Sequence, residues 1–171
     1  MKFTDCYVGW PGSVHDNRVF KNSDLFERVE QDEVTMCPNG SFIVGDAAYQ
    51  LMTWVMTPFK DNGKVTREQK TYNYIQSSTR TVIERAFGLL KGRFPRLRYL
   101  DMSNLEDMCK MIIAICTIHN FILDQDDGLE FDNIEIVPEE EVNNFTCMSY
   151  SNGHAQRKRD DIVKLLNNME L

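Results

Sequence analysis

The sequence has little of what would anchor a protein in a membrane or cross-link it. No apolar run reaches the ~18 residues of a membrane-spanning helix, and the N-terminus lacks the basic and then apolar pattern of a signal peptide. The five cysteines are odd in number and never spaced as Cys-x-x-Cys, which predicts neither a disulfide framework nor a zinc knuckle. There is no glycine-rich phosphate loop and no Gly-x-Ser-x-Gly motif. We expect a soluble chain in a reducing compartment, with no membrane partner.

Basic residues are absent from one long segment and concentrated in another. Residues 124–146 hold nine acids and no Lys or Arg, whereas residues 60–98 hold ten bases against three acids, within a net charge of −7. A basic region followed by an acidic segment is typical of a polyanion-binding surface, although solvated surface would give the same pattern. The division that we expect is a domain at 1–123, a disordered acidic linker at 124–146, and a tail with a short amphipathic helix at 147–171.

The hydrophobic periodicity predicts an α/β domain. Strands are expected at 2–10, before a Pro-Gly turn, and at 41–45, where a short β-branched run is typical of a buried strand. Helices are expected within 13–31 with Ser13 or Ser23 as caps, at 79–94 with Thr79 as cap, at 105–123, and at 156–169. Residues 52–59 fit either a strand or a helical turn. The helix at 105–123 is apolar nearly all round, which predicts burial.

Asp46 directly follows the predicted strand at 41–45. The carboxyl ends of strands are where open α/β sheets bind their ligands, so a catalytic or metal-binding role is reasonable. The alternative is that Asp46 only stabilises a turn into Ala47 and Ala48.

Glu84 lies on the helix predicted at 79–94, away from its apolar stripe. Its neighbours at i−4, i+4 and i+7 are Arg80, Gly88 and Lys91. Gly88 costs about 0.5–1 kcal/mol in a helix interior, yet it leaves room beside the carboxylate. The alternative is an exposed glutamate that contacts Arg80.

These residues together indicate phosphodiester chemistry. Two carboxylates can hold Mg²⁺ through oxygen ligands, and nearby guanidinium groups can bind a phosphodiester. Such chemistry commonly uses two metal ions, for which a third acid would be required. The candidate DNA-binding residues are Arg80, Arg85, Lys91 and Arg93.

Several blocks of the sequence closely resemble, in the same order, the PIF/Harbinger transposases and the domesticated harbinger transposase-derived nucleases. These blocks include residues 10–20 (WPGSVHDNRVF), 44–49 (VGDAAY), 57–59 (TPF), 78–80 (STR), 83–91 (IERAFGLLK) and 118–121 (IHNF), with a weaker echo at 158–163.

The resemblance implies a ribonuclease-H-like DDE nuclease fold in which three acids bind two divalent ions, Mg²⁺ or Mn²⁺. Asp46 matches the second acid and Glu84 the third, whereas the first acid has no counterpart. We therefore expect an incomplete fold that lacks the first strand or strands, and no Mg²⁺-dependent nicking by these 171 residues. Asp16 matches a family position outside the triad, which suggests a helix start or a supporting position beside the site.

The function expected is that of a transposase-derived, metal-dependent DNA endonuclease domain. The alternatives are a non-catalytic DNA- or protein-binding module and a decaying transposon fragment. The resemblance also implies DNA as a partner, together with a Myb/SANT-like protein that supplies sequence-specific binding and nuclear entry. The oligomeric state is left open.

Overall fold

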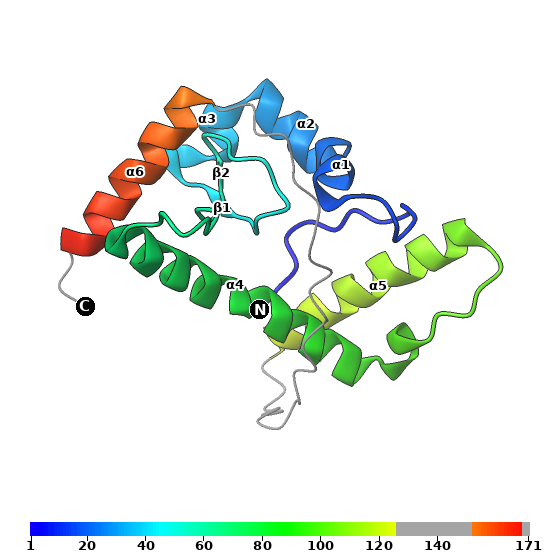
Figure 1. Cartoon of the computed structure of the whole chain (residues 1–171). Coiled ribbons are helices and arrows are strands. Elements are labelled where there is room, and N and C mark those ends of the chain that lie inside the picture. Colours follow the sequence, from blue (N-terminus) through cyan, green and yellow to red (C-terminus); the bar gives the residue numbers. More distant parts are fainter. Residues whose placement is uncertain (126–151, 169–171) are drawn as a thin grey trace. The chain divides into compact units, whose positions relative to one another are not determined.

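The computed structural model describes residues 1–125 and 152–168 (Figure 1). The described residues form two compact units, and each is treated by itself. The strand unit consists of residues 13–80 and 152–168, and the α5 unit consists of residues 1–12 and 81–125. The predicted linker at 124–146 lies almost entirely outside the described residues.

The strand unit begins with short helices whose first turns are held by side chains. Helix α1 (Asp16–Lys21) starts at His15, and α2 (Asp24–Gln31) starts at Ser23, whose hydroxyl accepts a hydrogen bond from the Phe26 N–H. Such a cap satisfies one of the free N–H groups of a helix start. Helix α3 (Glu33–Met36) and the 3₁₀ turn η1 (Pro38–Gly40) follow. The prediction of one or two short helices within 13–31 is confirmed, with Ser23 as the cap of α2, whereas Ser13 is not a cap because His15 is the cap of α1.

The sheet of the strand unit has two short parallel strands. In β1 (Ile43–Val44) and β2 (Val55–Met56), Ile43 pairs with Val55 and Val44 with Met56. The strand predicted at 41–45 is thus confirmed at its centre, and the ambiguous segment 52–59 contributes a strand. The described residues are otherwise mostly helical, so the sheet is much smaller than the α/β prediction implied.

Aromatic packing forms the core of the strand unit. Trp54 is 1% exposed, and its ring lies 5.6 Å from Phe20 and 5.5 Å from Phe26, measured between ring centroids. Tyr49 packs edge-on against Phe20 at 5.3 Å. These contacts hold the segment after β1 against α1 and α2.

Helix α4 (Arg67–Arg93) is twelve residues longer at its start than the sequence predicted. Thr66 and Gln69 form a capping box, in which the Gln69 side chain accepts from the Thr66 N–H and the Thr66 hydroxyl accepts from the Gln69 N–H. Thr79 is therefore not a cap; its hydroxyl donates to the carbonyl of Ile75 inside the helix.

Helix α6 (Gly153–Asn168) folds back onto the strand unit. Lys158 donates to the Thr53 carbonyl at 2.6 Å, and the Arg159 guanidinium stacks 3.8 Å from the ring centroid of Phe59. The apolar stripe predicted for this helix is only partly right, because Ala155 and Val163 are the buried residues and Leu165 is 61% exposed.

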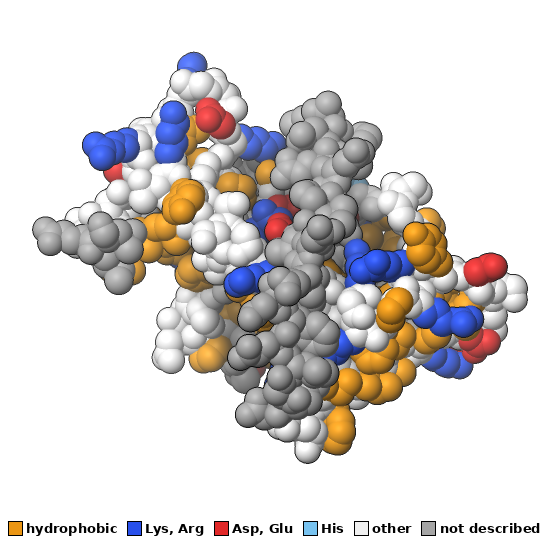
Figure 2. Space-filling model, turned by 90° about the horizontal axis from the view of Figure 1, so that it is seen from below, with side chains coloured by type: hydrophobic (Ala, Val, Ile, Leu, Met, Phe, Trp, Pro, Cys, Tyr) orange, Lys and Arg blue, Asp and Glu red, His pale blue; other side chains and the backbone are white. Residues whose placement is uncertain are grey.

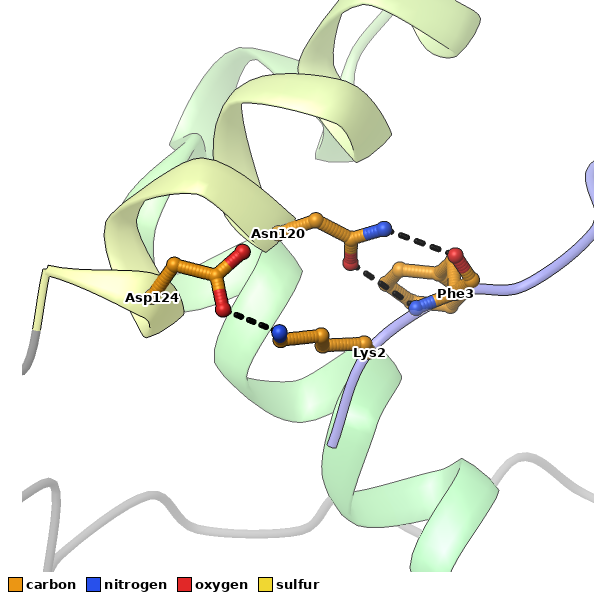
Figure 3. A network of polar contacts seen from close by, with 4 residues as sticks. All are labelled: Lys2, Phe3, Asn120 and Asp124. Carbon is orange, nitrogen blue, oxygen red and sulfur yellow. Dashed lines mark hydrogen bonds and ion pairs between the residues drawn. The ribbon is translucent and has the colours of Figure 1, made fainter.

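The strand predicted at 2–10 is wrong. The segment has no sheet partner among the described residues, and Gly9 adopts a positive φ of 110°. Asn120 of α5 replaces a neighbouring strand: its side chain accepts from the Phe3 N–H at 2.9 Å and donates to the Phe3 carbonyl at 2.7 Å (Figure 3). An ion pair between Lys2 and Asp124 accompanies these bonds (Figure 3).

In the α5 unit, the N-terminal segment packs against α4 and α5. The ring of Phe3 lies 5.5 Å from Phe87 and 5.4 Å from His119, measured between centroids. His119 is fully buried, with its Nε2 atom 3.1 Å from the Met1 carbonyl oxygen. It is therefore a core histidine, as its place on an apolar helix suggests.

Helix α5 (Leu105–Asp124) follows the 3₁₀ turn η2 (Pro95–Arg98) and has the bounds that the sequence predicts. Its predicted burial is wrong, because only Ile115, Cys116 and His119 are buried. Ile118 is 47% and Phe121 63% exposed. Figure 2 shows such exposed hydrophobic side chains in orange. Within the described ranges, no helix is long and apolar enough to cross a membrane.

Candidate functional site

Asp46 lies at the carboxyl end of β1, where the backbone is held on both sides. The Gly45 N–H donates to the Met56 carbonyl at 3.0 Å, and the Gly45 carbonyl accepts from the side-chain amide of Gln76 at 2.5 Å. A Cβ atom at Gly45 would lie 3.1 Å from the ring of Tyr49, so the close packing favours glycine there. This short strand thus fixes the position of Asp46 relative to α4.

The carboxylate of Asp46 has two different surroundings. Its Oδ1 atom accepts from the Ala48 N–H at 2.8 Å, which closes a turn. Its Oδ2 atom lies 3.6 Å from Nη2 of Arg80. The interpretation that Asp46 stabilises a turn is therefore confirmed, while its catalytic or metal-binding role stays a prediction.

The Asp46–Arg80 pair is half-buried. The side chains are 34% and 29% exposed, so solvent screens their attraction and the pair contributes little to stability. The single contact at 3.6 Å is an ion pair and not a hydrogen bond, so it draws the two side chains toward each other without fixing the guanidinium. The ion pair that Arg80 makes in the strand unit is with Asp46, and the contact with Glu84 that the sequence allows stays a prediction.

Asp16 begins α1, as one of the two predicted roles requires. Burial raises the pKa of Tyr49, and the negative charges of Asp16 and Asp46 raise it further. Asp16 and Asp46 thus act on the same phenol from two elements of the strand unit. A supporting role of Asp16 in a metal site stays a prediction.

Glu84 lies on α4 one helical turn after Arg80, in the part of the helix that belongs to the α5 unit. Glu84 and Arg85 are exposed. Lys91 and Arg93 are half-buried, and Nε and Nη1 of Arg93 are inaccessible to solvent. The meeting of Glu84 with Asp46 around one ion, and the binding of DNA by these basic residues, stay predictions.

The chemistry of these side chains suits a divalent cation with hard ligands. Mg²⁺ prefers carboxylate oxygen and is commonly held by one or two carboxylates, with water and phosphate completing its shell. The carboxylate of Asp46, on a side chain that is 34% exposed, has this chemistry. Among residues 1–125 and 152–168, no group of three or more His, Cys, Asp or Glu side chains is close enough to form a complete metal cage. An ion held at Asp46 would therefore need further ligands from water or from the substrate.

Sequence reasoning missed the part played by α6. Arg159 donates to the carbonyls of Thr57 and Pro58 at 3.3 and 3.4 Å, so it attaches α6 to the segment that follows β2. The weak family echo at 158–163 was the available signal, but it did not reveal which segment these residues contact.

Several known proteins are similar to this chain in sequence. The family model described as DDE superfamily endonuclease matches residues 1–120. The chain is 35% identical to the mouse protein named "Putative nuclease HARBI1" over 123 residues, which cover 68% of this chain and 33% of that protein. It is 30% identical to the Arabidopsis thaliana "Protein ALP1-like" over 141 residues, which cover 74% of this chain and 34% of that protein.

A Xenopus laevis protein, also named "Putative nuclease HARBI1", is 28% identical over 160 residues, which cover 89% of this chain and 43% of that protein. The chain spans about a third of the length of the mouse and Arabidopsis thaliana relatives. No solved structure matches it.

Proposed function

Because the chain belongs to the DDE superfamily endonuclease family, in its Harbinger-derived branch, we propose that it is part of a divalent-metal-dependent DNA endonuclease. The family has a ribonuclease-H-like fold and generally uses divalent metal ions. The observation that carries the proposal is the placement of Asp46, at the end of a strand, with one carboxylate oxygen fixed by a turn and the other beside Arg80.

In this proposal, the carboxylates of Asp46 and of Glu84, on α4, would hold the ion. When bound, Mg²⁺ or Mn²⁺ supplies charge stabilisation at a phosphodiester and an activated water. Arg80 exchanges part of its contact with Asp46 for the incoming phosphate, because a guanidinium binds either anion through the same fork. Asp16 and Tyr49 support the turn that presents Asp46.

Metal titration tests the ligands directly. Free Mn²⁺ is measured by electron paramagnetic resonance as the 171-residue chain is added. Asp46→Asn and Glu84→Gln should each weaken binding at least about tenfold, because each removes one of very few charged ligands. Asp61→Asn is the matched control, since Asp61 closes a similar turn by accepting from the Gly63 N–H. Equal binding by Asp46→Asn and Asp61→Asn would reject the metal site.

DNA binding is tested by its dependence on salt. Phosphate contacts release counterions, so affinity should fall steeply with salt, and the slope should decrease by about 1 in Arg80→Gln and in Arg85→Gln. Lys91→Gln and Arg93→Gln extend the test to the half-buried members. Lys110→Gln is the control, because Lys110 pairs with Glu106 on α5. A flat salt response would favour the alternative of a protein-docking module.

Two further parts of the proposal come from the family resemblance. A Myb/SANT-like protein would supply sequence-specific DNA binding and bring the chain into the nucleus. A fluorescently tagged chain should then be nuclear when the partner is co-expressed and less so without it.

The expectation that these 171 residues do not nick DNA is tested with supercoiled plasmid and Mg²⁺. Nicking that is lost in Glu84→Gln would contradict this expectation.

A further inference from the structure

A pocket of about 360 Å³ lies within the strand unit, next to the turn that holds Asp46. Its walls come from four segments: residues 47–51 after β1, residues 57–65 after β2, Gln69 in the first turn of α4, and the start of α6. Binding sites for small ligands commonly begin near this volume. Because Ala47 lines the pocket, a bound ligand would lie beside the backbone of the Asp46 turn.

The charges that line the pocket are all positive. Lys60, Lys64 and Arg159 contribute cations, and no Asp or Glu is found among the described lining residues. Asp61, in the same loop, accepts from the Gly63 N–H and does not line the pocket. The direct partners of Arg159 are the neutral Thr57 and Pro58 carbonyls and the ring of Phe59, although the charge of Asp160, next to it on α6, offsets part of its positive charge. An anion is therefore the favoured ligand.

Side-chain amides provide a second kind of recognition. Gln50 and Gln69 are already engaged, the first by Lys21 and the second by the Thr66 N–H. Asn62 and Gln156 also line the pocket, and neither side-chain amide makes a hydrogen bond in the described part of the chain. An amide offers both donors and an acceptor, which is the combination found on the edges of nucleobases. Leu51, Pro58 and Val65 supply apolar surface for a flat ring.

From these features we propose that the pocket binds one nucleotide of a nucleic-acid strand. Lys60 and Lys64 contact its phosphate, while Asn62 and Gln156 hydrogen-bond to its base. This inference rests on the proposed function, because the DNA bound by the endonuclease would be the source of the nucleotide. It adds that a nucleotide near the phosphodiester at Asp46 is unstacked and held by the chain, which resembles the way enzymes hold bases taken out of a duplex.

Isothermal titration with a deoxynucleoside 5′-monophosphate, in EDTA, tests the phosphate contacts. The double variant Lys60→Gln with Lys64→Gln should bind about tenfold or more weakly, because two charge-assisted hydrogen bonds are lost. Both lysines are exposed, so the fold should survive the change. Lys70→Gln is the control, since Lys70 is an exposed lysine outside the pocket. Equal binding by the double variant and the control, or no binding by the unmodified chain, would overturn the proposal.

Inorganic phosphate and O-phosphoserine separate a nucleotide from other phosphorylated ligands. Asn62→Ala and Gln156→Ala should weaken nucleotide binding by about threefold to tenfold, the effect of losing one hydrogen bond, and leave phosphate binding unchanged. O-phosphoserine that binds as tightly as the nucleotide would overturn the nucleotide assignment. Because EDTA removes metal ions, the nucleotide titration does not depend on the metal site. A chain that binds the nucleotide but not Mn²⁺ would reject only the metal site. A chain that binds Mn²⁺ but not the nucleotide would reject only this pocket.

Discussion

In the strand unit, the rings of Phe20, Phe26 and Tyr49 form a core with Trp54, which is 1% exposed, whereas in the α5 unit Phe121 is 63% exposed. The α5 unit buries a smaller cluster of Leu90, Ile115 and Cys116 and leaves large apolar side chains on the surface of α5. Since buried apolar area is the main source of stability, we expect the strand unit to contribute more of the chain's free energy of unfolding.

The chain carries one tryptophan in each unit, which allows the two to be followed separately. Trp10 belongs to the α5 unit and Trp54 to the strand unit, and the sequence contains no other tryptophan. Trp54→Phe leaves Trp10 as the reporter, and Trp10→Phe leaves Trp54. Urea unfolding followed by fluorescence then compares the units directly.

The largest effect is expected from the core of the strand unit. Trp54→Ala should lower the free energy of unfolding by about 3–5 kcal/mol, because it removes a fully buried ring and leaves a cavity among the aromatic neighbours. Urea denaturation followed by far-ultraviolet circular dichroism measures the change. A loss below about 1 kcal/mol would show that the aromatic cluster does not dominate this unit.

A smaller loss is expected where α5 holds the N-terminal segment. Asn120→Ala removes both hydrogen bonds to Phe3 and should cost about 1–3 kcal/mol in the α5 unit, because the backbone groups of Phe3 are half-buried. Trp10 fluorescence reports the transition, and hydrogen exchange should accelerate at the Phe3 amide. Asn168→Ala, an exposed change on α6, is the control. Unchanged exchange at Phe3 would mean that Asn120 does not hold the segment.

His119 should make the stability of the α5 unit depend on pH. Burial lowers the pKa of His119, the hydrogen bond to Met1 opposes this effect in part, and the charge of Arg93 lowers the pKa further. The unfolded chain, with a histidine pKa of about 6.5, then binds more protons than the folded chain as the pH falls, so stability decreases below about pH 6.5. The urea midpoint of Trp10 fluorescence should follow this decrease and become flatter in His119→Gln. An equally steep dependence in His119→Gln would assign it to other groups.

The smallest effect is expected on the surface of α5. Phe121→Ser should change the free energy of unfolding by about 0.5 kcal/mol or less, because the ring already contacts water in the folded chain. Phe26→Ser, in the core of the strand unit, is the contrasting variant and should be clearly destabilising. If both serine variants lost similar stability, the proposed contrast between the units would be wrong.

Local sequence signals predicted the elements whose partners are close in the chain. The bounds of α5 and the cap at Ser23 depend on nearby residues and are confirmed. The start of α4 was missed because residues 67–78 are polar and show little periodicity, although Thr66 and Gln69 carry the capping-box pattern. The strand at 2–10 was wrong because a strand requires a partner, and here Asn120, distant in the sequence, satisfies Phe3 instead.

The same distinction applies to the candidate site. The place of Asp46 at a strand end followed from the apolar run before it, and the structure confirms this place. The pairing of Asp46 with Arg80 and the pocket closed by Arg159 required contacts between segments far apart in the sequence. Composition revealed that residues 60–98 are basic but not that Lys60 and Lys64 share a pocket with α6.

The turn at Asp46 makes the length of this side chain as important as its charge. Because Oδ1 bonds to the N–H two residues later, the direction of Oδ2 is set by the main chain and costs no further rotamer entropy. A glutamate keeps the charge but adds a methylene, which shifts the bond to Ala48 and displaces the free oxygen. We therefore expect Asp46→Glu, which keeps the charge, to lose as much metal affinity as Asp46→Asn, which removes it.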